Sequence, residues 1–283
     1  MTGLSSATDY LTMVDIPPDM VAELGLGVEA LMRADGEVAL PASHAPYLFS
    51  VHLPFTDDEG RLNVGAYDEA RREVSIDTVL GAIDVACDVG AARGVIHSMG
   101  LVRFEGAEVG DWDRTVAGLQ RIADYARAKD LELVLENVVF YWPPVPPHIP
   151  AEQADRSQCL YQLGREPQEW RELWAAIDRD NVRLCLDTSH ATTRAVASSN
   201  LEEQIKCVHE FLDVGGDLIT HVHWSDNYLG GHRGRDDSHL HVGQGTLPRA
   251  FHARVKQLAA VKHLEHKSTV EELRAELAYI EHL

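Results

Sequence analysis

Nine histidine, aspartate and glutamate residues, of types that bind divalent metal ions, lie at the ends of short apolar runs of the sequence or in the segments that follow them. Three of the runs read SVH, GVIH and LELVLE, and they end at His52, His97 and Glu136. The whole set is His52, His97, Glu136, Asp187, His190, His223, Asp237, His239 and Glu265. Mixed imidazole and carboxylate groups suit Zn²⁺, Mn²⁺ or Fe²⁺, so these residues would form a metal site wherever the fold brought them together.

The elements that must position these residues alternate between short strands and longer helices. Apolar and β-branched runs predict strands at Thr2–Ser5, Leu26–Met32, Leu48–Leu53, Gly94–His97, Leu131–Glu136, Val182–Asp187, Leu218–Trp224 and Val261–Glu265. Helical spacing predicts helices over 76–87 behind Ser75 as N-cap, Asp113–Lys129, Pro167–Arg179, Asn200–Val214, Leu247–Leu258, and 270–280 behind the capping box Thr269-x-x-Glu272. This alternation predicts an α/β fold, a single (β/α)₈ TIM barrel over residues 1–283, because no linker or repeat marks a domain boundary.

Such a barrel would bring the nine residues to one place. The C-terminal ends of its strands meet at a single mouth, where active sites of this architecture lie. Five histidines and four carboxylates would then converge there. A buried carboxylate costs several kcal/mol unless it is paired or bound to a cation. We therefore expect one to three divalent ions per chain, with Zn, Mn, Fe or Mg as candidates.

Four further histidines lie close to these positions in sequence. His221 and His241 lie two residues from an expected ligand, a spacing that returns a side chain to the same face of a strand. They are expected to support ligands or contact substrate, or to be ligands themselves. His263 is expected on the inward face one layer below Glu265, and His266 is expected to face the helices. Both are interpreted as structural residues.

Two connections depart from the regular pattern. Residues Arg33–Ala45 lack helical spacing, which predicts a loop in place of one outer helix. The segment Tyr141–Gln162 follows the fifth strand and contains five of the 12 prolines, so its first half is not expected to be helical. At this position it would overhang the mouth as a lid or pack as a surface excursion.

Composition restricts the partners. The chain of 283 residues has 25 Lys and Arg against 45 Asp and Glu, a net charge of −20, and only five lysines. An acidic surface repels polyanions, although adaptation to high salt would produce the same surface. No apolar run is long enough for a membrane span, the four cysteines lack paired short spacing, and the N-terminus does not read as a signal peptide. We therefore expect a cytoplasmic protein with a small-molecule substrate, and neither a nucleic acid nor a membrane as partner.

The motifs LEN at 135–137, LDTSH at 186–190, H-x-S-D at 223–226, D-x-H-x-x-x-G-x-G at 237–245 and the glutamate of HLEH resemble the xylose isomerase-like TIM-barrel superfamily. That superfamily contains endonuclease IV, hexulose epimerases and proteins labelled sugar phosphate isomerase/epimerase. The resemblance extends from Leu26 to Glu265 and implies that all nine residues occupy the positions of the endonuclease IV trinuclear metal cluster. It also implies that Glu136, Asp187, His223 and Glu265 match the single-metal site of the epimerases.

Two mechanisms follow from these positions, and the isomerase or epimerase mechanism is the expected one. One metal would hold the oxygens of a sugar, polyol or sugar phosphate while Glu136 and Glu265 act as base and acid. His190 would orient a hydroxyl, and Arg233 or Arg235 would meet a phosphate if the substrate carries one.

The alternative is an endonuclease IV-like multi-metal phosphoesterase, acting on abasic DNA or on a small phosphoester. It gives ligand roles to His52, His97, Asp237 and His239. The net charge, the short Arg33–Ala45 segment and the sequence TGLSS at the first strand, which lacks a G-x-H-x-S motif, oppose a DNA substrate. A barrel that binds metal without catalysis is a third class, which would usually show a missing ligand.

Overall fold

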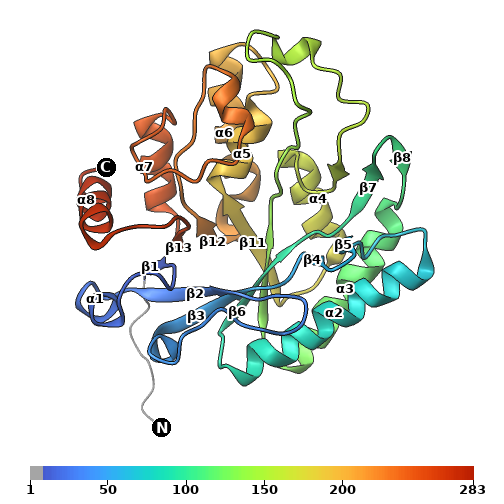
Figure 1. Ribbon diagram of the computed structural model, residues 1–283, viewed down its shortest axis with the longest axis horizontal. Coiled ribbons are helices and arrows are strands. Elements are labelled where there is room, and N and C mark those ends of the chain that lie inside the picture. The colour runs from blue at the N-terminus through green and yellow to red at the C-terminus, as the bar shows by residue number, and fades with distance from the viewer. Residues whose placement is uncertain (1–8) are drawn as a thin grey trace.

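A closed barrel of eight parallel strands forms the centre of the protein, as seen in a computed structural model that describes residues 9–283 (Figure 1). In the order in which they pair, the strands are β1 (Tyr10–Thr12), β13 (Val261–Leu264), β12 (Ile219–His223), β11 (Val182–Asp187), β9 (Glu132–Glu136), β6 (Arg93–His97), β3 (Leu48–His52) and β2 (Gly27–Leu31). The predicted TIM barrel is therefore confirmed. The strand expected at Thr2–Ser5 lies outside the described residues, and β1 closes the barrel between β13 and β2.

Helices surround the barrel on its outer side (Figure 1). They are α1 (Pro18–Glu23), α2 (Glu69–Asp88), α3 (Trp112–Ala128), α4 (Pro167–Ile177), α5 (Thr188–Ala195), α6 (Leu201–Gly215), α7 (Arg249–Gln257) and α8 (Val270–Glu281). The short helices α1 and α5 were not predicted, and the other six were. No helix of the described chain is long and apolar enough to cross a membrane.

Two helix starts show how local hydrogen bonds set the boundaries. The capping box of α8 is confirmed, because the Thr269 hydroxyl accepts from the Glu272 backbone N–H and the Glu272 carboxylate accepts from Thr269. The predicted cap of α2 at Ser75 is wrong. The carboxylate of Asp68 accepts from the N–H groups of Ala70 and Arg71, so α2 begins nearly two turns earlier.

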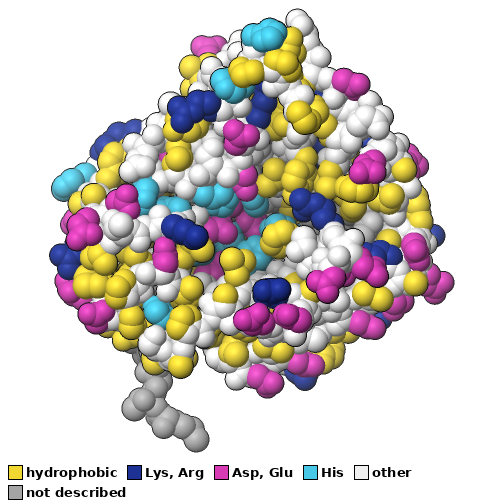
Figure 2. Space-filling view, viewed as in Figure 1, with side chains coloured by type: hydrophobic (Ala, Val, Ile, Leu, Met, Phe, Trp, Pro, Cys, Tyr) yellow, Lys and Arg dark blue, Asp and Glu magenta, His cyan; other side chains and the backbone are white. Residues whose placement is uncertain are grey.

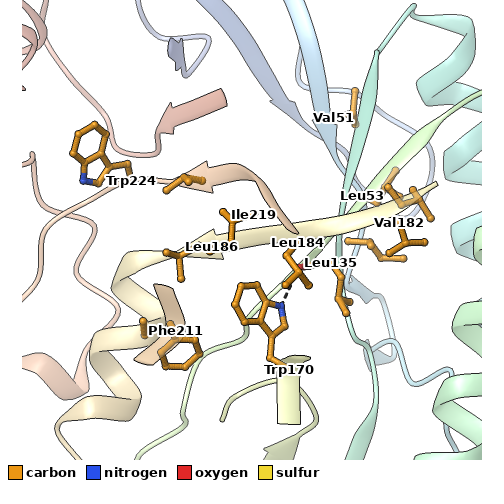
Figure 3. Packing of buried hydrophobic residues seen from close by; sticks show 14 of the residues in the cluster. Val51, Leu53, Leu135, Trp170, Val182, Leu184, Leu186, Phe211, Ile219 and Trp224 are labelled. Atoms are coloured by element: carbon orange, nitrogen blue, oxygen red, sulfur yellow. Dashed lines mark hydrogen bonds between the residues drawn. The ribbon is translucent and has the colours of Figure 1, made fainter. Parts of the chain in front are cut away.

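The apolar core lies between the strands and the helices. Trp170 of α4 and Phe211 of α6 are fully buried with their ring centroids 6.0 Å apart, and they cover residues of β9 and β11 (Figure 3). The indole N–H of Trp170 donates to the carbonyl of Leu135 at 3.0 Å. This bond fixes the backbone of β9 one residue before Glu136.

Two irregular connections match the sequence prediction. Residues 33–44 contain no helix, and only the short 3₁₀ turn Ala45–Tyr47 precedes β3. The proline-rich segment contains one 3₁₀ turn, Ala151–Gln153, and ends in β10 (Tyr161–Gln162), which pairs with β7 (Leu101–Phe104). It packs against α5, because the Trp142 indole N–H donates to the carbonyl of Thr193 at 2.9 Å.

Candidate metal centre

All nine residues predicted as ligands lie together at the mouth of the barrel, where Figure 2 shows histidine and acidic side chains gathered in a central hollow. Strand register explains part of this grouping. His97 of β6 is directly paired with Glu136 of β9, and Asp187 of β11 is paired with His223 of β12. Since parallel strands in register end at the same level, their last side chains meet.

Glu136 is at the centre of the cluster. Its Oε2 lies 2.9 Å from Nε2 of His97 and 3.2 Å from Nε2 of His52, and its Oε1 lies 2.8 Å from Nδ1 of His223. Burial alone would raise the pKa of Glu136, but the neighbouring rings of His223 and His97 outweigh burial and hold the pKa well below its usual range. Glu136 is therefore a buried carboxylate with an imidazole nitrogen beside each of its oxygens.

Asp187 combines a structural bond with a free ligand atom. Its Oδ1 caps α5 by accepting the backbone N–H of His190 at 2.7 Å. Its Oδ2 is buried and has no hydrogen-bond partner within residues 9–283. Burial, with the nearby charges of Glu265 and Glu136, raises the pKa of Asp187 to about 7. A cation bound at Oδ2 would favour the ionised form instead.

Asn137, the last residue of the LEN motif, holds Asp187 in place. Its amide donates to the carbonyl of Asp187 at 3.0 Å, and its amide oxygen accepts the N–H of Asp187 at 2.7 Å. The backbone carbonyl of Asn137 also lies 2.8 Å from Nδ1 of His190. One buried residue thus fixes two of the predicted site residues.

Three histidines present the same nitrogen to the cluster. Nδ1 of His52, His190 and His239 each lies within 3.0 Å of a backbone carbonyl, that of Leu53, Asn137 and Glu265 respectively. Only a ring N–H can serve a carbonyl, so Nδ1 carries a proton in each ring, and Nε2 is the nitrogen that the neutral ring would offer to a metal. In all three rings Nε2 faces a carboxylate of the cluster, at 3.1 to 3.3 Å. Histidines that bind metals are held in this way.

The outer part of the cluster is open to solvent. Nε2 of His190 lies 3.3 Å from Asp237, and Nε2 of His239 lies 3.1 Å from the other oxygen of Asp237. The side chains of Asp237, His239 and Glu265 are 32, 22 and 21 % exposed, whereas Glu136 and Asp187 are essentially buried. A substrate would therefore reach the cluster from the side of Asp237 and Glu265.

The side chains fit divalent ions in two respects. Oδ2 of Asp187 and Oε2 of Glu265 are buried carboxylate oxygens without a hydrogen-bond partner in the described chain. The donors also fall into groups whose atoms lie within 4.8 Å of one another, namely His52 with His97 and Glu136, and Asp187 with His190, Asp237 and His239. His223 connects these groups, because its Nδ1 lies 2.8 Å from Glu136, 3.8 Å from Asp187 and 2.9 Å from Glu265.

Aromatic and cationic side chains border the cluster. The ring of Phe55 stacks on His97 with centroids 4.6 Å apart, which gives the cluster an apolar side. Arg235, expected near a substrate phosphate, stacks on Trp142 at 4.8 Å and donates to the carbonyl of Ile149 at 2.9 Å. Arg233 stacks on Tyr228 at 3.5 Å. Both arginines are thus bound to other parts of the protein in this structure.

One buried carboxylate was missed at the sequence level. Glu29 of β2 lies below the mouth, with Oε1 2.9 Å from Nε2 of His223 and Oε2 accepting the hydroxyl of Ser50 at 2.6 Å. The only signal was a single charged residue inside the apolar run LGVEALM. Both faces of a barrel strand are buried, so alternation does not reveal which residues point inward.

With this geometry in view, comparison with known sequences assigns the class. A sequence profile of xylose isomerase-like TIM barrels matches residues 27–282. The chain therefore belongs to the xylose isomerase-like TIM-barrel family.

Two curated relatives match over most of their length. An uncharacterized protein of Methanocaldococcus jannaschii is 23 % identical over 86 % of this chain and 79 % of its own length. A probable endonuclease 4 of Mycobacterium leprae is 24 % identical over 86 % of this chain and 82 % of its own.

Solved structures share the fold at low identity. A D-tagatose 3-epimerase-like protein superposes with a TM-score of 0.65 at 20 % identity, covering 97 % of this chain and 99 % of the other. Endonuclease IV of Thermus thermophilus gives 0.63 at 20 %, covering 97 % of this chain and all of the other. A protein described as epimerase-like and an endonuclease IV thus share the fold of this chain.

Proposed function

We propose that this protein is a divalent-metal-dependent hydrolase that cleaves a phosphoester of a small molecule, with two or three ions at the barrel mouth. The observation that carries this proposal is the orientation of His52 and His239. Each has Nδ1 fixed by a backbone carbonyl and Nε2 directed at a carboxylate of the cluster. A single-metal epimerase would have no ligand role for these rings, whereas additional ions would use both.

The bound ions would stabilise the attacking and leaving oxygens of a phosphoester. Glu136 would hold ions on both of its oxygens, since nitrogen ligands lie beside each oxygen. Asp187 would contribute Oδ2, which its capping role leaves free. His190, with Nδ1 on a carbonyl, would present Nε2 beside Asp237 at the solvent-facing side.

The proposed substrate is small rather than a nucleic acid. The net charge of −20 opposes approach of a polyanion, and the connection over residues 33–44 is short. Arg61 lies near the mouth, where its guanidinium is 4.5 Å from the ring of Tyr141. It is a cation available to a phosphate at the edge of the hollow.

A second candidate is the single-metal epimerase expected from the sequence. The observation that favours it is the compact set around His223, whose Nδ1 lies 2.8 Å from Glu136 and 2.9 Å from Glu265. Two glutamates on opposite sides of one site suit the removal and return of a proton at a sugar carbon.

One experiment separates the two candidates. The purified protein with added Zn²⁺ or Mn²⁺ is assayed on p-nitrophenyl phosphate, bis(p-nitrophenyl) phosphate and an abasic duplex, and in parallel on D-tagatose in D₂O by NMR. We expect p-nitrophenol release, abolished in Glu136→Gln and retained in Glu276→Gln, a buried glutamate outside the mouth. Deuterium exchange into the ketose without phosphoester cleavage would instead establish the epimerase, and cleavage of the duplex alone would refute the small substrate.

A further inference from the structure

The interior of the barrel directly below the mouth is divided into an apolar and a polar half. Val95, Val134 and Cys185 form a small buried cluster separate from the main core. Beside this cluster, the strands β2, β12 and β13 place Glu29, His221 and His263, which are at most 5 % exposed, and His221 is directly paired with Cys185. A carboxylate and two imidazoles at this depth are costly unless their polar atoms are satisfied.

The carboxylate of Glu29 is in contact with three imidazole rings. Its Oε1 lies 2.9 Å from Nε2 of His223 and 3.2 Å from Nδ1 of His263, and its Oε2 lies 3.1 Å from Nε2 of His221. Ligand atoms of Glu29, His223 and His263 all lie within 4.8 Å of one another. Within residues 9–283, no lysine or arginine forms an ion pair with Glu29.

These short distances are not accompanied by hydrogen bonds. Nε2 of His223 and both ring nitrogens of His221 and His263 are buried and have no hydrogen-bond partner in the described part of the chain. Two ligands of one zinc ion, each about 2.0–2.1 Å from it, are separated by roughly 3.3 Å, and their lone pairs point at the ion rather than at each other. Contacts near 3 Å without hydrogen-bond alignment are therefore the arrangement that a shared ion produces.

A second cluster of similar composition shows the opposite behaviour. Glu276 of α8 is buried and lies 2.8 Å from Nε2 of His266 and 3.2 Å from Nδ1 of His241, and both contacts are hydrogen bonds. Its other oxygen accepts the N–H of Val242 at 2.6 Å. This carboxylate is satisfied by protein donors alone, so residue types by themselves do not distinguish the two clusters.

We propose that Glu29, His223 and His263 hold a second divalent cation inside the barrel, with zinc as the preferred ion and with His221 beside the other oxygen of Glu29. His223 would serve both sites as an imidazolate, which has released both ring protons and offers Nδ1 at the mouth and Nε2 in the interior. The proposal goes beyond the proposed function and does not depend on which reaction occurs at the mouth.

The position of this site assigns it a structural role. All of these side chains are buried below the mouth, so a substrate would not reach an ion bound there. The ligands come from β2 on one side and from β12 and β13 on the other, and the strand between β2 and β13 is β1, which has only three residues. An ion held there would join the barrel across its shortest strand.

The direct test is zinc-edge anomalous diffraction from crystals of the wild-type protein grown with ZnCl₂. We expect an anomalous peak bonded to Glu29 and His263, separate from any peak beside Glu136 at the mouth. Zinc at the mouth with no peak in the interior would overturn the proposal and leave the proposed function intact. An interior peak without zinc at the mouth would support the interior site and overturn the proposed function.

Variants test the same site in solution by zinc content after dialysis. His263→Gln and Glu29→Gln are expected to hold one zinc fewer per chain than the wild type, and the matched control Glu276→Gln is expected to hold the same number. Unchanged zinc content in a folded His263→Gln variant would contradict the site and would mean that Glu29 only accepts a proton from His223. Diffraction from the wild type decides the matter if both interior variants fail to fold.

Discussion

Replacement of Asn137 by alanine tests how the chain holds its candidate metal ligands. The Asn137 side chain makes two hydrogen bonds to the backbone of Asp187, and both residues are fully buried. The alanine variant leaves the N–H and C=O of Asp187 without these partners, where water does not reach them. Each unpaired buried group costs about 1–3 kcal/mol, so the free energy of unfolding should fall by about 2–6 kcal/mol.

The same substitution should weaken metal binding at the mouth. Asp187 would lose the contact that fixes its backbone, and loss of such supporting contacts typically costs about 10–100-fold in metal affinity. Urea unfolding of the metal-free protein measures the first effect, and zinc titration against a chelator measures the second.

A control separates stability from positioning. Asn181→Ala removes a side-chain amide that donates to the carbonyl of Ala123 at 2.9 Å, away from the mouth. This variant should lose stability but bind zinc with wild-type affinity. If Asn137→Ala bound zinc as tightly as Asn181→Ala does, the role assigned to Asn137 in positioning Asp187 would be refuted.

Two further predictions concern ions and pH. Removal of divalent ions with EDTA should lower Tm by about 10 °C, because a ligand at about 1,000 times its Kd contributes about 4 kcal/mol to the free energy of unfolding. Addition of Zn²⁺ should restore the Tm, and differential scanning calorimetry measures both changes. An unchanged Tm would argue against tightly bound ions. Hydrogen bonds from Arg71, at 2.6 and 3.0 Å, lower the pKa of Asp57 in the folded protein. The ionised carboxylate therefore stabilises the fold at pH values above its unfolded pKa of about 3.9, and this stabilisation is lost as the pH falls through the folded pKa. Asp57→Asn should therefore lower the free energy of unfolding by about 1.5 kcal/mol at pH 7 and leave it unchanged in strong acid. Urea unfolding of the wild type and the variant across pH measures this difference, and a difference that does not depend on pH would contradict the ion pair.

The sequence predicted the barrel and the grouping of the nine residues for the same reason. Each apolar run was long enough to identify a strand, and a polar residue such as His97 or Glu136 marked its C-terminal end. The barrel geometry then required those ends to meet. Their roles as metal ligands and catalytic groups remain predictions.

Other features could not be predicted because their signals were local or absent. β1 has three residues, too few to show alternation. α5 was missed because its N-cap is Asp187, a residue that was interpreted only as a ligand. Glu29 belongs to a strand buried on both faces, so its contact with His221 and His263 depends on three strands far apart in sequence.

The zinc content of wild-type protein and of the Glu136→Gln variant tests the metal centre most directly. Both proteins are dialysed against Zn²⁺, freed of unbound metal and analysed by mass spectrometry of the elements. Because Glu136 lies between the His97 side and the His223 side of the cluster, the variant should lose at least two zinc ions per chain relative to the wild type. Loss of a single ion would support the one-metal epimerase, and equal zinc content in the two proteins would contradict a metal centre at the mouth.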